Sequence, residues 1–429
     1  MMTFAFYTLG CKVNQYETAA MERMLVAAGY TPTLSDAQPD IFIINSCTVT
    51  AESDRKTRQT VRKYRRELPN SVIVLTGCMP QAFPDDANEI DAADIVLGNH
   101  SNNRLCEAID KFLETNKRVV MIDEHKKGDL FDTPPIDKIE ERTRAYLKIQ
   151  DGCNRFCSYC IIPTARGRER SKPLEDIKSE VSSIAKMGHK EIVLVGINLS
   201  AYGNDIEATL CDAVDVVCAV DGIERVRLGS LEPDIFTDEM MTRLKNQPKF
   251  CPQFHFSLQS GCDQTLKRMN RHYDTEFYRN LIRRVRNNFD NAAITTDIMV
   301  GFAGESEDEF KQSLGFAREI GFARAHIFAY SRRTGTVAAR AKNQVTNAEK
   351  RTRSQKMIAV TKESEAAFLK SQVGKVCSVL FETKRGNLNE GYTKNYTYVK
   401  VDSSDDLCGE IRDVRITDTA DDYCVGELV

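Results

Sequence analysis

The sequence predicts an α/β protein in three parts: a doubly wound parallel α/β domain, an incomplete parallel (β/α)6 barrel and a small antiparallel β-barrel of the OB type. Three observations indicate this. Short apolar runs alternate with helical segments over residues 1–123 and again over 143–370, as in parallel sheets. Residues 124–142 are polar and contain Pro134-Pro135, which is typical of a linker. Residues 371–429 are rich in β-branched and aromatic residues with close turns, as in small barrels.

The first region contains five apolar runs of strand length, among them TFAFYTL, IFIINS and VIVLTG. Between the first two runs, Ala20, Met24, Ala27 and Ala28 recur at helical spacing, which predicts an amphipathic helix buried on that face. Strands alternating with helices predict a parallel sheet covered on both sides.

Cys11, Cys47 and Cys78 each follow one of the first three apolar runs within a residue or two. Ligands bind at the carboxyl ends of the strands in open parallel sheets, so these thiols could converge on one crevice. Free cysteine is also a common buried residue, and three unrelated buried cysteines would give the same pattern.

Residues 143–370 contain six strand–helix units, several of them with a glycine where a helix should end. Six units predict an incomplete barrel; a closed eight-stranded barrel is the alternative. The active site of such a fold lies at the carboxyl ends of the strands. Polar residues stand at the predicted strand ends: Asp151, Asn198, Ser230, Glu232, Ser257, Gln259, Asp297, His326 and Tyr330.

The loop after the first of these strands carries Cys153, Cys157 and Cys160, with the spacing C-x3-C-x2-C. A structural zinc site normally takes four ligands and a disulfide takes two. Three thiolates can hold a 4Fe–4S cluster and leave one iron open for S-adenosylmethionine, whose radical chemistry belongs to the cofactor. A three-thiol zinc site with a distant fourth ligand is the alternative.

The chain resembles the radical-SAM methylthiotransferase family from end to end, in the motifs TLGCKVNQYE, NSCTVT, TGCMPQ, CSYCIIPTARGRERS, SLQSGCDQTLKRMNR and DIMVGFAGE. The resemblance implies two 4Fe–4S clusters facing one substrate pocket. The ligands it implies are Cys11, Cys47 and Cys78 for an auxiliary, sulfur-presenting cluster and Cys153, Cys157 and Cys160 for the radical-SAM cluster. It further implies that S-adenosylmethionine supplies both the radical and the methyl group, and that residues 371–429 form an RNA-binding TRAM domain.

Three substrates are known for this family: isopentenylated adenosine 37 of tRNA, threonylcarbamoylated adenosine 37 of tRNA, and an aspartate of a ribosomal protein. The motif around Cys11, with residues 230–233 and 326–336, resembles the bacterial threonylcarbamoyladenosine branch. The resemblance therefore implies methylthiolation at C2 of that nucleoside. Cys262 departs from the pattern, since serine is expected there; it is either a thiol in the pocket or a small packed residue.

Contacts to S-adenosylmethionine are expected from residues at the strand ends and near the cluster loop: Tyr159, Asn198, Glu232, Gln259, Arg271 and Asp297. Arg271 could pair with the carboxylate of the cofactor or of the substrate. Each of these side chains could instead be a hydrogen-bonded structural residue, and His326 is expected to be structural or to stack on substrate.

RNA contacts are expected from Arg55, Arg58, Arg62 and Arg66, which share one helical face and could follow phosphates. Further cations near the barrel mouth are Arg166, Arg168, Arg332 and Arg333. The C-terminal part is acidic overall, but it has a cluster that could form a basic and aromatic face: Lys384, Arg385, Lys394 and Lys400 with Tyr392, Tyr396 and Tyr398. A solvated surface is the alternative for each group.

Composition and charge limit how the chain could bind nucleic acid and what its cysteines could do. The 429 residues are 41% hydrophobic and 28% charged, with a net charge of −3, so nucleic-acid binding must come from local patches. The sequence shows no apolar run of about 18 residues and no secretory signal, and its 14 cysteines are expected to be ligands and buried thiols. We expect a cytoplasmic enzyme with tRNA, a flavodoxin-type electron donor and a sulfur donor as partners, and no membrane. A non-catalytic, zinc-stabilised RNA-binding protein is the alternative from another class.

Overall fold

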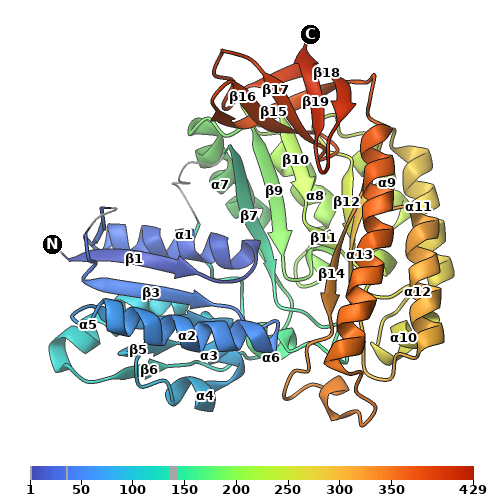
Figure 1. Cartoon of the computed structure of the whole chain (residues 1–429). Coiled ribbons are helices and arrows are strands. Elements are labelled where there is room, and N and C mark those ends of the chain that lie inside the picture. The colour runs from blue at the N-terminus through green and yellow to red at the C-terminus, as the bar shows by residue number, and fades with distance from the viewer. Residues whose placement is uncertain (1, 35–36, 136–142) are drawn as a thin grey trace.

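A computed structural model describes residues 2–34, 37–135 and 143–429. Part of the predicted linker, residues 136–142, lies outside the described residues. Figure 1 shows the N-terminal α/β unit beside the open barrel, and the small C-terminal barrel at the end where the strands of the open barrel begin. None of the helices in the described ranges has both the length and the apolar character needed to cross a membrane.

The N-terminal unit is a parallel sheet in the order β2-β1-β3-β4-β5-β6. Side chains alternate between its two faces: Ile41 and Ile43 pack toward α1 (Lys12–Ala27) and α5 (Leu105–Thr115), whereas Phe42 and Ile44 pack toward α2 (Ala51–Glu67). The predicted doubly wound sheet is confirmed. The strands are β1 (Thr3–Thr8), β2 (Thr31–Pro32), β3 (Ile41–Ser46), β4 (Val72–Gly77), β5 (Ile95–Leu97) and β6 (Val119–Met121), and the remaining helices are α3 (Cys78–Ala82), α4 (Pro84–Asn88) and the 3-10 helix η1 (Asn99–Arg104).

Only part of the predicted face of helix α1 is buried: Ala20 is buried and Met24 is half-buried. Ala27 and Ala28 are exposed, and the buried residues are Val13, Asn14, Tyr16, Glu17, Thr18, Ala20, Met21 and Leu25. The reason is that the helix is covered on two sides. Met21 and Leu25 pack on the N-terminal sheet, whereas Tyr16 and Ala20 belong to the core of the open barrel.

The open barrel has six main parallel strands in two hydrogen-bonded halves, β10-β9-β7-β8 and β11-β12-β13-β14. The halves meet where the Cys251 amide donates to the Val226 carbonyl at 2.9 Å. Within the described residues β8 and β14 are edge strands, so the barrel is incomplete, as predicted. The main strands are β7 (Arg144–Asp151), β9 (Glu191–Gly196), β10 (Arg225–Leu228), β12 (Gln253–Phe256), β13 (Ala293–Val300) and β14 (Arg324–Ala329), with short β8 (Arg170–Ser171) and β11 (Ser230–Leu231).

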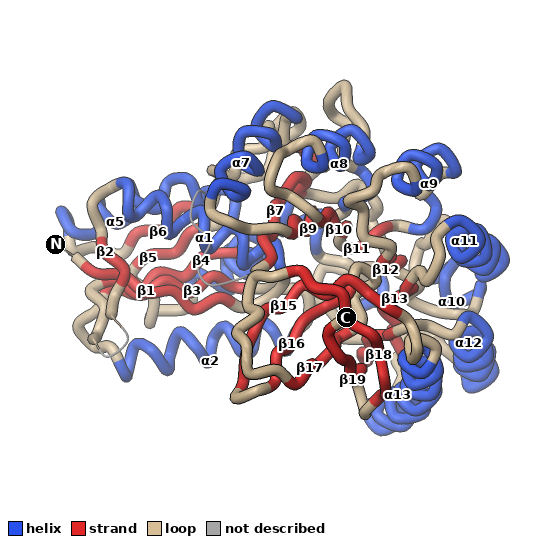
Figure 2. The backbone as a smooth tube through the Cα atoms, turned by 90° about the horizontal axis from the view of Figure 1, so that it is seen from above, coloured by secondary structure: helices blue, strands red, loops and turns tan. Residues whose placement is uncertain are grey.

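Helices surround the strands of the open barrel on the outside, as the view from above shows (Figure 2). They shield apolar strand residues such as Leu147, Ile192 and Leu194, which lie in one large core with residues of the helices. These helices are α7 (Leu174–Lys186), α8 (Leu210–Cys218), α9 (Asp238–Lys245), α10 (Asp263–Arg268), α11 (Thr275–Asn288), α12 (Glu307–Ile320) and α13 (Asn347–Lys370); the short α6 (Ile162–Arg166) lies at the junction with the N-terminal unit.

The C-terminal barrel is closed in the order β15-β16-β17-β19-β18. Neighbouring strands run antiparallel except β17 and β19, which are parallel. The predicted small antiparallel barrel is confirmed; its one parallel pair follows from closure, because a closed ring with an odd number of strands must contain a parallel pair. The strands are β15 (Val376–Arg385), β16 (Leu388–Thr393), β17 (Tyr398–Asp402), β18 (Ile411–Thr419) and β19 (Cys424–Leu428).

Candidate active site

The loop with Cys153, Cys157 and Cys160 leaves the carboxyl end of β7 through Gly152. This glycine has φ +71°, and a Cβ atom there would lie 1.8 Å from the backbone oxygen of Arg168, so no other residue fits. The Ser158 amide donates to the Met269 carbonyl at 3.0 Å, and its hydroxyl donates to the Arg268 carbonyl at 2.7 Å. The three cysteines therefore lie on a loop that backbone contacts hold in place.

One arginine donates a hydrogen bond to a sulfur of this first group of thiols. Arg271 donates to Cys157 Sγ at 3.3 Å, and the same guanidinium pairs with Glu232. Burial raises the pKa of Cys153 to about 11 and that of Cys160 to about 12. Without a metal partner these thiols stay protonated at neutral pH, and binding of a cluster would release their protons.

The second group follows three neighbouring strands of the N-terminal sheet: Cys11 caps α1 after β1, Cys47 follows β3, and Cys78 begins α3 after β4. Burial raises the pKa of Cys47 and raises that of Cys78 to about 12, with a further increase from the neighbouring thiols of the group. The structure thus brings the three thiols together at the carboxyl edge of the sheet.

The two groups lie on adjoining loops. Arg166, in α6 just after Cys160, donates through Nε to Cys78 Sγ at 3.2 Å. Ile161 and Ala165 pack directly with Cys78, and α3 and α6 are neighbours in Figure 1. Each group of thiols therefore has one buried arginine that donates to one of its sulfurs. The arginine of the second group, Arg166, comes from the segment that follows the cysteine loop of the first group.

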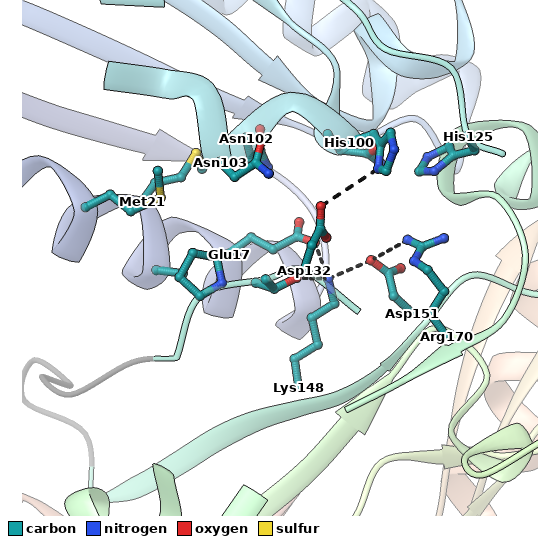
Figure 3. Close-up of a pocket in the computed structure, with 15 residues that line it drawn as sticks. Glu17, Met21, His100, Asn102, Asn103, His125, Asp132, Lys148, Asp151 and Arg170 are labelled. Carbon is teal, nitrogen blue, oxygen red and sulfur yellow. Dashed lines mark hydrogen bonds and ion pairs between the residues drawn. The ribbon is translucent and has the colours of Figure 1, made fainter. Parts of the chain in front are cut away.

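Arg166 is not an RNA contact, contrary to the sequence-based expectation, because its side chain is only 1% exposed. It pairs with Glu17 of α1, and Lys148 of β7 pairs with Glu17 and Asp151 at 2.7 and 2.6 Å (Figure 3). Burial alone would raise the pKa of Glu17, but the charges of Arg166 and Lys148 outweigh it and hold that pKa below its ordinary value. This ion network joins the N-terminal unit to the barrel.

Arg333 was also expected to contact RNA, and this expectation was wrong. It is buried, and its guanidinium donates to Asp54 at 2.7 Å and to Thr48 at 2.8 Å in the N-terminal unit. Arg332 and Arg168 are exposed, with Arg168 over the ring of Phe156 at 5.0 Å. The structure therefore divides the cations near the mouth into two surface residues and two that join the domains.

The predicted arginine row on α2 lies on the surface. Arg55, Arg62 and Arg66 are exposed, and Arg58 is half-buried with a guanidinium nitrogen 3.8 Å from Asp86. Exposure leaves this row available to phosphates.

The predicted basic and aromatic face of the C-terminal barrel is not one surface. The rings of Tyr392 and Tyr396 lie 4.7 and 4.9 Å from the guanidinium of Arg144, and Lys394 donates to the Pro248 carbonyl at 3.0 Å. These residues dock the C-terminal barrel on the open barrel, because both elements bury them together. Arg385, 78% exposed at its side chain, remains on the surface, with Lys384 and Lys400 half-buried.

The residues expected to bind S-adenosylmethionine differ in their surroundings. Gln259 has φ +66°, and its backbone bridges to β13 through Asp297 O and the Met299 amide. Asp297 lies within β13 rather than at its end, 3.3 Å from His255 Nε2. Glu232 is paired with Arg271. Cys262 is buried 3.4 Å from Gln312, as a small packed residue would be.

Two of these positions retain features suited to a ligand. The side-chain oxygen of Asn198 is buried and has no hydrogen-bond partner in the described part of the chain, while its backbone amide is fixed by Gln150 at 2.7 Å. Tyr159 packs edge-on against Phe302 beside the cluster loop. An unpaired buried oxygen at the mouth fits an incoming donor such as an amino or hydroxyl group.

Lys12 is a site residue that the sequence reasoning missed. Its ammonium lies 5.4 Å from the ring of Tyr146 on β7, and Val13 beside it packs on Val193 and Val195 of β9. On the far side of the opening, burial lowers the pKa of His326, and the charge of Lys12 contributes to that shift. Helix α1 therefore carries a cation into the open side of the barrel, next to Cys11; its place directly after the cysteine was the only sequence signal.

The spacing of the thiols bears on what they hold. In the described chain only His100, His125 and Asp129 form a set of three ligand-type groups with all donor atoms within 4.8 Å of one another. The sulfurs around a single zinc ion would be about 3.8 Å apart, given bonds of about 2.3 Å. Neither group of three thiols is that compact, so both fit a larger cluster better than one zinc ion.

Comparison with known proteins agrees with this arrangement. Residues 147–317 match the Radical SAM superfamily, and residues 3–98 match a family described as uncharacterized protein family UPF0004. The threonylcarbamoyladenosine tRNA methylthiotransferase MtaB of Bacillus subtilis is 36% identical over 100% of this chain and 97% of its own length. The MtaB of Thermotoga maritima is 37% identical over 97% and 94%. A tRNA-2-methylthio-N(6)-dimethylallyladenosine synthase of Caldicellulosiruptor saccharolyticus is 33% identical over 100% and 92%.

Among solved structures, the radical S-adenosylmethionine methyltransferase TsrM of Kitasatospora setae superposes with a TM-score of 0.59 at 13% identity, over 79% of this chain and 77% of that one. That likeness concerns the fold alone. The full-length relatives carry the family assignment: this chain belongs to the radical-SAM methylthiotransferases, enzymes that use S-adenosylmethionine and two 4Fe–4S clusters.

Proposed function

We propose that this enzyme adds a methylthio group to C2 of N6-threonylcarbamoyladenosine at position 37 of tRNA. The observation that carries the proposal is the contact between Arg166 and Cys78, which sets the two groups of thiols on one junction at the barrel mouth. A single substrate pocket can then face both. The names of the most similar relatives support this substrate over isopentenyladenosine and over a ribosomal protein.

In this proposal Cys153, Cys157 and Cys160 hold the cluster that binds S-adenosylmethionine, and Cys11, Cys47 and Cys78 hold the auxiliary cluster. The bound groups supply the redox and sulfur chemistry, and the protein supplies orientation and exclusion of water. Arg271 and Arg166 each donate to a ligand sulfur, which offsets negative charge and fixes the ligand in place. Asn198 offers its unpaired oxygen to the cofactor.

Lys12 supports the choice of nucleoside. The threonylcarbamoyl group ends in a carboxylate, whereas an isopentenyl group is wholly apolar. Lys12 is an exposed residue whose ammonium lies 5.4 Å from the ring of Tyr146. Desolvation there, together with the charges of Arg144 and Arg227, lowers its pKa to about 8, so it is mostly charged at neutral pH. A charged donor in such a place favours a substrate carboxylate and gains nothing from an apolar group.

RNA contacts in this proposal come from exposed and half-buried cations, with the C-terminal barrel as a TRAM-type binding module. They are the row Arg55, Arg58, Arg62 and Arg66, the mouth residues Arg168 and Arg332, and Lys384 and Arg385. A flavodoxin-type protein as electron donor, a separate sulfur donor and a cytoplasmic location complete the proposal.

The deciding experiment is mass spectrometry of tRNA nucleosides from cells with and without this gene. We expect the 2-methylthio form of threonylcarbamoyladenosine to disappear and its precursor to accumulate when the gene is absent. A change confined to isopentenyladenosine would overturn the proposed substrate while leaving the family assignment intact.

A further inference from the structure

A separate group of ligand-type side chains lies where the N-terminal unit meets the segment after β6. It consists of His100 in η1 together with His125 and Asp129. Asp129 Oδ2 is 3.3 Å from His100 Nε2 and 3.9 Å from His125 Nδ1, and the two imidazole centroids are 4.5 Å apart. Donor atoms around a tetrahedral zinc ion are about 3.3 Å apart for bonds of about 2.0–2.1 Å. The three groups are thus close to the spacing of metal ligands.

The proton positions on His125 favour a cation between these groups. Its Nε2 lies 3.3 Å from the Ala165 carbonyl, which can only accept, so Nε2 carries the hydrogen and Nδ1 carries a lone pair. That lone pair faces the carboxylate of Asp129. The Nδ1 atom is buried, has no hydrogen-bond partner in the described structure, and belongs to a side chain that is 9% exposed. Two acceptors therefore face each other with no proton between them.

The surroundings of these groups also bear on a metal site. Asp132 Oδ2 approaches the other nitrogen of His100, Nδ1, at 4.0 Å (Figure 3). Imidazoles that bind metals commonly have a carboxylate or a carbonyl at their second nitrogen. Here His125 has the Ala165 carbonyl at 3.3 Å, whereas Asp132 lies beyond hydrogen-bond distance of His100 Nδ1, and this nitrogen has no partner among the described residues. Among the residues described, neither Asp129 nor Asp132 forms an ion pair with lysine or arginine. The nearby Arg170 is paired with Asp151 at 3.4 Å.

We propose that His100, His125 and Asp129 bind one divalent transition-metal ion of the zinc class. Two imidazoles and one carboxylate are a common ligand set for such ions. The ion would fasten the segment after β6 to the cluster loops. The Ala165 carbonyl that faces His125 also accepts from Asn99, whose amide is 3.7 Å from Cys78 Sγ. This site is separate from both groups of thiols and does not depend on the proposed substrate.

The test uses the full-length enzyme with both clusters reconstituted, so that the six cluster thiols are occupied. After exposure to Zn²⁺ and dialysis, we expect about one zinc per chain beside the cluster iron. His125→Ala and the isosteric Asp129→Asn should lose the zinc and keep the iron. His189→Ala, in the turn before β9, is the matched control and should keep both.

Co²⁺ in place of Zn²⁺ identifies the ligands, because thiolate ligation gives intense charge-transfer bands that imidazole and carboxylate ligation lacks. We expect only weak visible bands, lost in Asp129→Asn. Zinc should also raise the melting temperature of the wild type and of His189→Ala but not of Asp129→Asn. Absence of zinc beside the iron, or full zinc retention in both variants, would overturn the proposal. If His125→Ala fails to fold, Asp129→Asn decides the question by itself.

Discussion

At the scale of single residues, an arginine beside each group of thiols has a more specific role than surface attraction. Arg166 and Arg271 are both buried, and each donates to one sulfur while pairing with a carboxylate. Hydrogen bonds to ligand sulfurs tune the reduction potential of an iron–sulfur cluster. The two arginines are thus placed to set the electronic properties of two different clusters.

Lys12 gives a test of substrate choice at this scale. Changing Lys12→Met removes the cation beside Cys11 but keeps the length of the side chain. A hydrogen bond to a charged group contributes about 1.5–3 kcal/mol, so kcat/KM for tRNA with threonylcarbamoyladenosine should fall about tenfold to a hundredfold. Steady-state kinetics with purified tRNA measures this, and Lys56→Met on the exposed face of α2 is the control. An unchanged kcat/KM would remove Lys12 from substrate binding.

Gly152 gives a test of the cluster loop. Gly152→Ala would place a Cβ atom against the Arg168 backbone, so we expect the loop to shift and the barrel cluster to be lost. Gly188→Ala is matched in backbone strain, with φ +89°, but has nothing within 4 Å of the new atom. Iron analysis after reconstitution should show about half the iron in Gly152→Ala and full iron in Gly188→Ala. Full iron in both would show that the loop tolerates the shift.

The loops that carry the cysteines could be located from the sequence, whereas the burial of Arg166 and Arg333 could not, for a physical reason. The spacing of Cys153, Cys157 and Cys160 is local, so geometry follows from three neighbouring positions. Arg166 stands in an equally local run of cations, but its partners Glu17 and Cys78 are 149 and 88 residues away. Only the packing of two domains distinguishes a buried ion pair from a surface charge.

At the scale of elements, α1 and β7 are joined by buried charges rather than by apolar contact alone. Glu17 of α1 faces Arg166 and Lys148, and Asp151 faces the same cations. Loss of one partner from a buried ion pair leaves an uncompensated charge and costs about 3–5 kcal/mol. The attachment of α1 to the barrel therefore depends on all four side chains.

This network predicts a pH dependence. The pKa of Glu17 is held below its ordinary value in the folded protein, so its contribution to stability is present above the unfolded pKa of about 4.3 and is lost as pH falls below it. In Glu17→Gln that contribution should be absent: stability at pH 7 should be lower, and its fall as the pH drops below about 5 should be smaller. Thermal unfolding of cluster-free protein, followed by circular dichroism, avoids acid loss of iron. An identical pH slope in both proteins would contradict this account.

At the scale of the whole molecule, the N-terminal sheet, the open barrel and the C-terminal barrel follow from their local patterns of strands and helices. The way these three parts dock on one another does not follow from those patterns. Arg225 and Arg227 begin the third strand of the open barrel, yet each donates at 2.9 Å to a carbonyl of the C-terminal barrel, those of Tyr392 and Lys394. Removing residues 371–429 would take away these carbonyl acceptors and, among the described residues, leave both guanidinium groups to Glu191 alone, so deletion would damage the catalytic domain as well as RNA binding.

A charge reversal tests RNA binding without that damage. Lys384→Glu with Arg385→Glu changes cations whose own contacts, Ser404 and Glu390, lie within the C-terminal barrel, so tRNA affinity should fall while S-adenosylmethionine cleavage without tRNA stays unchanged. Each lost phosphate contact should also reduce the slope of log affinity against log salt by about 0.7–0.9. Filter binding at several salt concentrations measures both. Arg412→Glu, an exposed cation of β18 paired with Glu410, is the control. Equal affinity and slope in all three proteins would exclude this surface.

The assignment of two clusters is tested on the complete enzyme. Wild-type protein should carry about eight irons after reconstitution if each group of thiols holds a four-iron cluster. The triple change of Cys153, Cys157 and Cys160 to Ala should leave about four. The corresponding change of Cys11, Cys47 and Cys78 should also leave about four, but should retain cleavage of S-adenosylmethionine. Retention of all iron in either triple variant would refute the ligand assignment.

The link between α6 and Cys78 also limits how this protein can be recombined. A chimera that exchanged residues 1–123 for those of a relative would bring a new α1 and a new third thiol against the resident Arg166, Lys148 and Asp151. If the new residues did not pair with these three, an unpaired charge would be buried where the two domains meet. A functional chimera would therefore have to transfer the N-terminal unit together with β7 and α6.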